Sequence, residues 1–156
     1  MVKKTFLVLI CFIGLIIFVS TLHGQGSKKT ITLPSGEVVC DLDGEWDALY
    51  ENLSITSSAA GSSRDILKIT QRGGSFEGVK MIGGVYVPKD AVSIKGELNK
   101  DGIAKVQVVM RILYSGDPGK MTAKQDLLDC KGQISEAGNK VIIDGCEPIK
   151  VTLTRK

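Results

Sequence analysis

Two short stretches decide the fold of this chain: Leu42-Asp43-Gly44-Glu45-Trp46 and Thr152-Leu153-Thr154-Arg155. Between them lie about eight short segments in which apolar and polar residues alternate, a pattern typical of half-buried β-strands. No segment keeps a 3.6-residue apolar period over more than two turns, so helices are not expected. The pattern predicts an all-β domain, a single up-and-down antiparallel β-barrel of about eight strands.

The lengths of the connections predict two unlike ends for this barrel. In an up-and-down barrel, alternate connections lie at opposite ends. The connections after every second strand are tight, whereas the others are mostly long. One end is therefore expected to be tight and the other broad and built from loops. The expected strands are Glu45–Tyr50, Ile66–Gln71, Ser75–Ile82, Val92–Leu98, Ala104–Leu113, Leu127–Ile134, Lys140–Asp144 and Ile149–Thr154.

Two hairpins predict the register of the sheet. The turn Asn99-Lys100-Asp101-Gly102 carries a glycine where a three-residue loop needs a left-handed residue. This loop pairs Leu98 with Ala104 and brings the apolar residues of both strands to one face. In the later hairpin, a four-residue loop pairs Ile134 with Val141 and has the same effect.

The first 26 residues have the pattern of a secretory signal. Lys3 and Lys4 precede an apolar run from Phe6 to Val19, and Gly24-Gln25-Gly26 offers small residues for cleavage. We therefore interpret residues 1–26 as a signal peptide, 27–40 as an N-terminal arm with an optional strand, and 41–156 as the β-barrel domain. The protein is expected in the periplasm or secreted. The alternative is an uncleaved anchor, which would be its only link to a membrane.

The charge and the histidine content exclude several classes of function. Cleavage after residue 26 removes Lys3, Lys4 and no acid, so 20 basic against 17 acidic side chains become 18 against 17. A nearly neutral domain without a basic run gives no reason to expect a nucleic-acid partner. Cleavage also removes His23, the single histidine. No catalytic set, metal site or cofactor is therefore expected, and the protein is interpreted as not an enzyme.

The ends of the barrel resemble those of the lipocalin and calycin families. Those barrels have a Gly-x-Trp at the first strand, as Gly44 and Trp46 do here, and a basic residue on the last strand that packs over the tryptophan, as Arg155 would. The resemblance implies that the first and last strands pair and that a guanidinium lies over an indole. The Gly-x-Trp region also looks like the avidin pattern, and bacterial calycin-type protease inhibitors are similar exported barrels with an N-terminal arm.

Three cysteines follow the signal segment: Cys40, Cys130 and Cys146. In an oxidising compartment, three cysteines give one disulfide and one left over. The register places Cys130 and Cys146 together at the broad end, provided that the strand breaks at Gly145. We therefore predict the Cys130–Cys146 bond, with Cys40 free, buried or linked to another molecule.

The broad end is where a ligand or partner would bind. The inward-facing positions are almost all apolar, so the barrel is either filled by its own side chains or leaves a small apolar cavity. Tyr50, Tyr86, Met110 and Tyr114 are the candidate contacts at the mouth; each is equally well explained as rim packing. The expected function is binding of a small apolar ligand. The alternatives are a secreted protein partner, as for a calycin-type inhibitor that uses residues 27–40 as its arm, or a solid structural barrel of the envelope.

Overall fold

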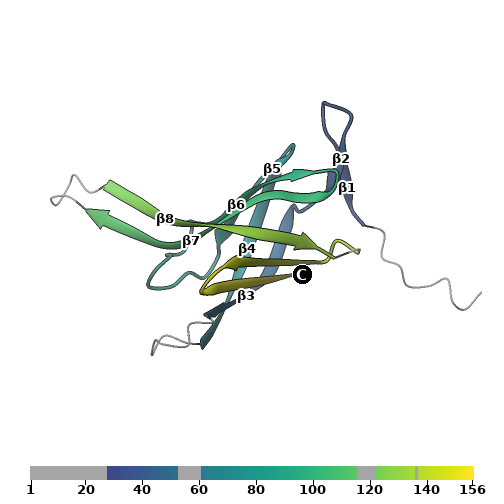
Figure 1. The fold of residues 1–156 in the computed structure, drawn as a ribbon. Coiled ribbons are helices and arrows are strands. Elements are labelled where there is room, and N and C mark those ends of the chain that lie inside the picture. Colours follow the sequence, from purple (N-terminus) through teal and green to yellow (C-terminus); the bar gives the residue numbers. More distant parts are fainter. Residues whose placement is uncertain (1–27, 53–60, 116–121, 136) are drawn as a thin grey trace, which may run out of the picture.

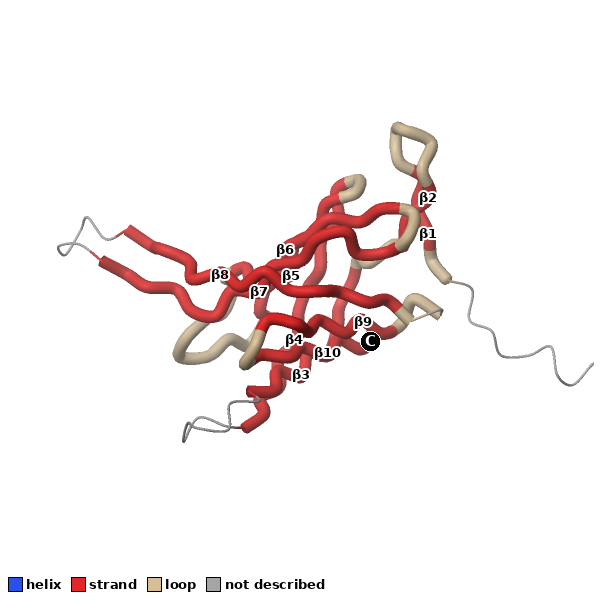
Figure 2. The backbone as a smooth tube through the Cα atoms, viewed as in Figure 1, coloured by secondary structure: helices blue, strands red, loops and turns tan. Residues whose placement is uncertain are grey.

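The computed structural model describes residues 28–52, 61–115, 122–135 and 137–156, and all regular secondary structure in these ranges is β-strand. Eight strands form a closed barrel in which each pairs antiparallel with the next, and the last returns to the first (Figures 1 and 2). The predicted all-β, up-and-down barrel is confirmed. The strands are β1 (Thr30–Thr32), β2 (Val38–Cys40), β3 (Gly44–Asn52), β4 (Gly61–Arg72), β5 (Ser75–Lys80), β6 (Val92–Asn99), β7 (Gly102–Ser115), β8 (Thr122–Ile134), β9 (Lys140–Cys146) and β10 (Ile149–Arg155).

The predicted signal peptide, residues 1–26, lies outside the described residues, as do residues 53–60 of the first long connection. The described part of the chain contains no helix with the length and apolar character needed to cross a membrane.

The half of the barrel at its tight end is filled by its own side chains. Alternate residues of each strand point inward because successive side chains of a strand face opposite sides of the sheet. The result is a continuous apolar core that includes the indole of Trp46 and leaves no room for a ligand at this level. Its fully buried members are Val39, Leu42, Trp46, Leu67, Ile69, Ile94, Val106, Val108, Val141, Ile143, Val151 and Leu153.

Three inward glycines belong to this filling rather than to a cavity. A Cβ on Gly96 would lie 2.6 Å from Cζ of Phe76, and a Cβ on Gly132 would lie 2.7 Å from Cδ1 of Ile103. Gly78 makes room for Ile94 in the same way. At each glycine, a large neighbouring side chain occupies the space that a Cβ atom would fill on the inner face of the sheet. The glycines therefore support close packing of the core.

The barrel closes where Trp46 meets Arg155. These residues are register partners in the β3–β10 ladder, and the guanidinium carbon of Arg155 lies 4.4 Å from the centre of the indole ring. The indole N–H donates to the carbonyl of Leu42 at 2.9 Å, which fixes the ring in the core. Nη1 of Arg155 donates to the carbonyl of Asp43 at 2.7 Å, and Nη2 donates to that of Asp41. The contact expected from the Gly-x-Trp start is present.

The segment before the barrel folds back on the tight end as the β1–β2 hairpin (Figure 1). Ile31 and Leu33 pack against the core. The carboxylate of Glu37 accepts a hydrogen bond from the backbone of Lys100 in the β6–β7 turn. The optional strand of the arm thus exists, and it is held against the barrel by apolar and polar contacts.

Two of the three long connections are shorter than expected because their strands run further, whereas β5 ends at Lys80, two residues before the expected Ile82. β4 begins at Gly61 rather than Ile66, and β7 and β8 continue to Ser115 and Thr122. Beyond Val109, β7 pairs only with β8 among the described ladders, so the two strands project past the barrel as a ribbon (Figure 2). The broad end is therefore built largely from strands, where the connection lengths predicted loops.

The register is as predicted in one hairpin, and in the other it departs from the prediction only next to the turn, since Gly96 pairs with Val106 and Ile94 with Val108 as expected. Ile134 pairs with Val141, as expected. Leu98 pairs with Ile103, whereas the sequence predicted Ala104. The register shifts between the pairs Glu97–Lys105 and Leu98–Ile103, which leaves Ala104 as the extra residue of a bulge on β7, and the loop then holds two residues instead of three.

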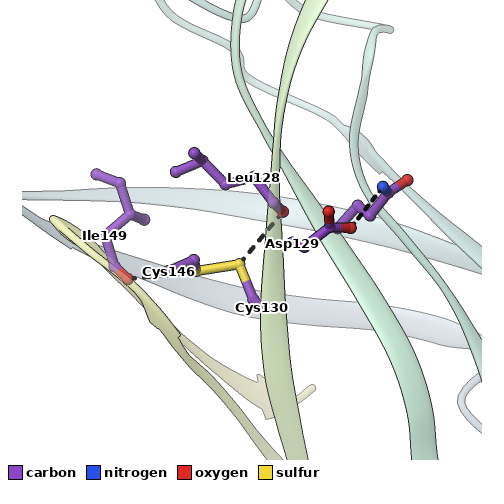
Figure 3. The surroundings of a disulfide bond; sticks show 6 residues. Leu128, Asp129, Cys130, Cys146 and Ile149 are labelled. Carbon is purple, nitrogen blue, oxygen red and sulfur yellow. Dashed lines mark hydrogen bonds between the residues drawn. A yellow bond between two sulfur atoms is a disulfide. The ribbon is translucent and has the colours of Figure 1, made fainter.

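The predicted disulfide joins Cys130 to Cys146, with 4.7 Å between their Cα atoms. The β8–β9 ladder ends at the pair Lys131 and Asp144, so the bond lies directly past its last pair. Figure 3 shows the bond between the two strands, with Leu128 and Ile149 beside it. The strand does not break at Gly145 but bulges there, with φ at 71°. The sulfur atoms contact the carbonyl oxygens of Leu128 and Ile149. Cys40 is free and buried.

Candidate functional site

A cavity of about 690 Å³ opens at the broad end of the barrel. It lies on the broad-end side of the filled core and extends along the inner side of the β7–β8 ribbon. Its lining comes from β3, β4, β5, β7, β8, β10 and the β5–β6 connection, that is from Tyr50, Asn52, Gly61, Ser62, Ser63, Lys80, Gly84, Val85, Tyr86, Val87, Val108, Val109, Met110, Arg111, Asp126 and Ile149. The barrel is thus solid at its tight end and hollow at its broad end.

The walls of the cavity are mainly apolar. Val108 and Val109 form one wall, Ile149 another, and the buried side chain of Val87 a third. Val108 and Val109 are consecutive residues of β7, both line the cavity, and they directly precede a bulge at Met110. Apolar walls of this kind are common in sites that bind small molecules.

The β5–β6 connection folds over the mouth and is held there by hydrogen bonds. The amide of Gly84 donates to the carbonyl of Val87 at 2.9 Å, and the amide of Ile112 on β7 donates to that of Tyr86 at 2.8 Å. Gly83 has a φ of 81°, and a Cβ there would lie 2.1 Å from the backbone nitrogen of Lys89, so only glycine fits. Val85 and Tyr86 stay 97% and 68% exposed at the rim.

A charged pair lies under this connection. Asp65 on β4 accepts hydrogen bonds from the amides of Ile66, Ile82 and Gly83 at 2.7, 3.1 and 3.0 Å. Its Oδ2 lies 3.5 Å from Nζ of Lys80, and the two side chains are 3% and 13% exposed. The carboxylate both anchors the connection and places the ammonium group at the cavity.

Tyr50 completes a polar cluster on the cavity wall. Its ring lies beneath the ammonium group of Lys80, with 4.3 Å from Nζ to the ring centre. Its hydroxyl is 2.8 Å from the hydroxyl of Ser93, a fully buried residue. Burial raises the pKa of the Tyr50 hydroxyl far above its ordinary value, the hydrogen bond with Ser93 opposes this shift, and the negative charge of Asp65 adds to it. Tyr50 is therefore a neutral hydrogen-bonding group.

Three of the four residues predicted at the mouth lie together. Tyr50, Tyr86 and Met110 all line the cavity. The backbone of Tyr114 pairs with Ala123 further along the β7–β8 ribbon, and the side chain of Tyr114 lies outside the described residues. The sequence did not identify the polar cluster of Asp65, Lys80 and Ser93.

A signal for two of these polar residues was present in the sequence. Asp65 precedes Leu67 by two positions and Lys80 follows Gly78 by two, so both continue the inward alternation of their strands. Ser93 had no such signal, because it is the extra residue of a bulge opposite Gly78 and Val79. The alternation of β6 places Ser93 outside, whereas the bulge turns it inward.

Comparisons of this chain with protein-family models, with curated proteins and with solved structures gave no match. The geometry of the cavity is therefore the main indication of function.

Proposed function

We propose that this chain is an exported, non-enzymatic binding protein of lipocalin-like architecture that holds a small apolar ligand in the cavity at its broad end. The observation that carries the proposal is the hollow of about 690 Å³ with apolar walls above a solid core. Ligand sites in proteins have volumes of roughly 300–1,000 Å³ and mostly apolar linings with a few placed polar groups. The cavity has both properties.

The disulfide supports the proposed compartment. Bonds such as Cys130–Cys146 form and persist in oxidising compartments, and they are rare in the reducing cytosol. Together with the signal-like residues 1–26, this favours the periplasm or the extracellular space.

The described residues also support a role in binding rather than in catalysis. The hydroxyl of Ser93 is buried and bonded to Tyr50, and Cys40 is buried. Burial raises the pKa of the Cys40 thiol, which opposes formation of a thiolate nucleophile. The other two cysteines of the exported part are joined in the disulfide.

The alternatives receive less support. An inhibitor that uses residues 27–40 as an arm needs that arm to reach into a protease, whereas Ile31 and Leu33 pack on the barrel core. A barrel with a purely structural role does not require a cavity at one end. The cavity therefore favours a ligand carrier over both.

The proposal is tested with an environment-sensitive apolar dye and with native mass spectrometry of the purified protein. We expect dye fluorescence to rise on binding and Met110→Glu to weaken binding at least tenfold, because it places a charge in the apolar cavity. Val38→Glu is the matched control, since Val38 is an exposed apolar residue of β2 at the opposite end. Absence of both dye binding and a co-purified ligand, or equal weakening by the two variants, would contradict the proposal.

A further inference from the structure

The ammonium group of Lys80 lies at the cavity with fewer hydrogen-bond acceptors around it than it has donors. A lysine ammonium has three N–H donors. The partners shown for it are Oδ2 of Asp65 at 3.5 Å, which is long for a hydrogen bond, and the face of the Tyr50 ring. A donor group that is 13% exposed and borders an apolar hollow favours a further acceptor.

Asp65 balances the charge of Lys80 but has little hydrogen-bonding capacity left for it. Three backbone amides already donate to its oxygens, two to Oδ1 and one to Oδ2. A carboxylate offers about four lone-pair sites, so the contact at 3.5 Å with the ammonium group is mainly electrostatic. The N–H groups of Lys80 therefore remain available to an acceptor in the cavity.

The Tyr50 hydroxyl supplies a second donor beside Lys80. Either hydroxyl of the Tyr50–Ser93 pair can donate to the other. When Ser93 donates, the proton of Tyr50 is left for a group in the cavity, which Tyr50 lines. Tyr50 keeps this proton because burial raises the pKa of its hydroxyl.

The other charges on the cavity wall pair with each other. Nε of Arg111 lies 3.0 Å from Oδ2 of Asp126 at the outer part of the hollow, and both side chains are about half exposed. Among the described lining residues, Asp126 is the single acid. Nothing else described in the lining supplies an anion to Lys80.

We propose that the ligand is an amphipathic carboxylate whose head group accepts hydrogen bonds from the Lys80 ammonium group and the Tyr50 hydroxyl and whose apolar tail lies along Val108, Val109 and Ile149. The two donors match the two oxygens of the head group. This inference rests on the proposed function, because it names the ligand class of the same cavity. Asp65 acts as a positioning residue that holds the ammonium group in place.

The test compares two probes with the full-length protein at neutral pH: a fluorescent long-chain carboxylic acid and its methyl ester. The ester keeps the tail and the carbonyl but loses the charge. Wild type is expected to bind the acid at least tenfold more tightly than the ester. Lys80→Met should remove this preference and leave ester binding within about twofold, since the tail contacts are unchanged.

Two further variants keep the test decisive. Lys80→Met leaves the Asp65 carboxylate buried without its cation, so the double variant Asp65→Asn/Lys80→Met removes both charges and should show the same loss of preference in a folded barrel. Lys68→Met is the matched control, because Lys68 is exposed on the neighbouring strand β4, and it should bind both probes as wild type does.

The outcomes separate this inference from the proposed function. Equal binding of acid and ester by wild type, or an unchanged preference in the double variant, would overturn the head-group site and leave the carrier function intact. If wild type binds neither the acid, nor the ester, nor the apolar dye, both the head-group site and the carrier function are overturned.

Discussion

Arg155 is the register partner of Trp46 across the seam that closes the barrel, and its guanidinium lies over the indole while its nitrogens donate to the carbonyls of Asp41 and Asp43. One side chain thus joins the last strand, the first strand and the segment that leads into it. The contact lies at the tight end, far from the cavity, so its contribution is to closure.

Arg155→Ala should therefore lower stability without affecting the cavity. Loss of the cation–π contact and of the two hydrogen bonds should cost about 1–3 kcal/mol and lower the Tm by several degrees. Thermal unfolding by circular dichroism measures the effect, and Lys156→Ala, which removes the exposed neighbouring cation, is the control. A Tm equal to that of wild type would show that closure does not depend on this contact.

Removal of the disulfide should weaken the barrel where β8 leaves β9. The double variant Cys130→Ala/Cys146→Ala should lose about 2–4 kcal/mol of unfolding free energy, since the bond closes a loop with a sequence separation of 16 residues. Urea unfolding with and without reductant measures it. Wild type and Cys40→Ala should both respond to the reductant, whereas the double variant should not. A reductant effect that persists in the double variant would argue against this bond.

Asp65→Ala should destabilise the β5–β6 connection and the barrel together. It removes the acceptor of three amides and leaves Lys80 without its partner, at a cost of about 3–5 kcal/mol. Urea unfolding and limited proteolysis within residues 81–91 measure the two effects. Asp47→Ala, an exposed acid on the adjacent strand β3, should change both by little. Similar losses in the two variants would contradict the anchoring role.

The Tyr50 hydroxyl should make the protein sensitive to alkali. Its pKa is raised in the folded state, and an unfolded tyrosine loses its proton near pH 10, so this contribution to stability is complete below about pH 10 and is lost as the pH rises further. The unfolding free energy should then fall by up to about 1.4 kcal/mol per pH unit from this group. Tyr50→Phe should flatten the profile, and Tyr86→Phe should not. Parallel profiles for wild type and Tyr50→Phe would refute the assignment.

Gly96→Ala should strain the core, because a Cβ there would lie 2.4 Å from the carbonyl oxygen of Lys105 and 2.6 Å from Phe76. We expect a loss of about 1–3 kcal/mol in urea unfolding, as for other overpacked cores. Gly84→Ala is the control, since nothing lies within 4 Å of its added Cβ. Equal stability of the Gly96→Ala variant and wild type would show that Phe76 and the backbone move aside at little cost.

The sequence predicted the solid part of this barrel well and its hollow part less well. Alternation alone identified Trp46, Leu67 and Val141 as interior residues, because regular strands keep a strict period of two. At the broad end the strands bulge at Ser93 and Met110, and each extra residue reverses the alternation beyond it. Such bulges depend on contacts between strands, which a single sequence does not display.

The charged pair was missed for a different reason. The sequence predicts a strand that begins at Ile66, so Asp65 falls in the preceding connection, and Lys80 lies within an expected strand without a sign of its partner. A buried charge is costly in isolation and is tolerated when amides and an opposite charge surround it. Those partners come from the β5–β6 connection and from Lys80, and their proximity follows only from the closed barrel.

The β1–β2 hairpin determines at which end of the barrel the described chain begins. Lys28, the first described residue, adjoins Gly138 at the tight end, beside the turn between β8 and β9. Any upstream segment therefore joins the protein on the side opposite the cavity. The entrance of the cavity and the start of the described chain thus lie at opposite ends of the barrel, so whatever is attached before Lys28 leaves the entrance free for a ligand.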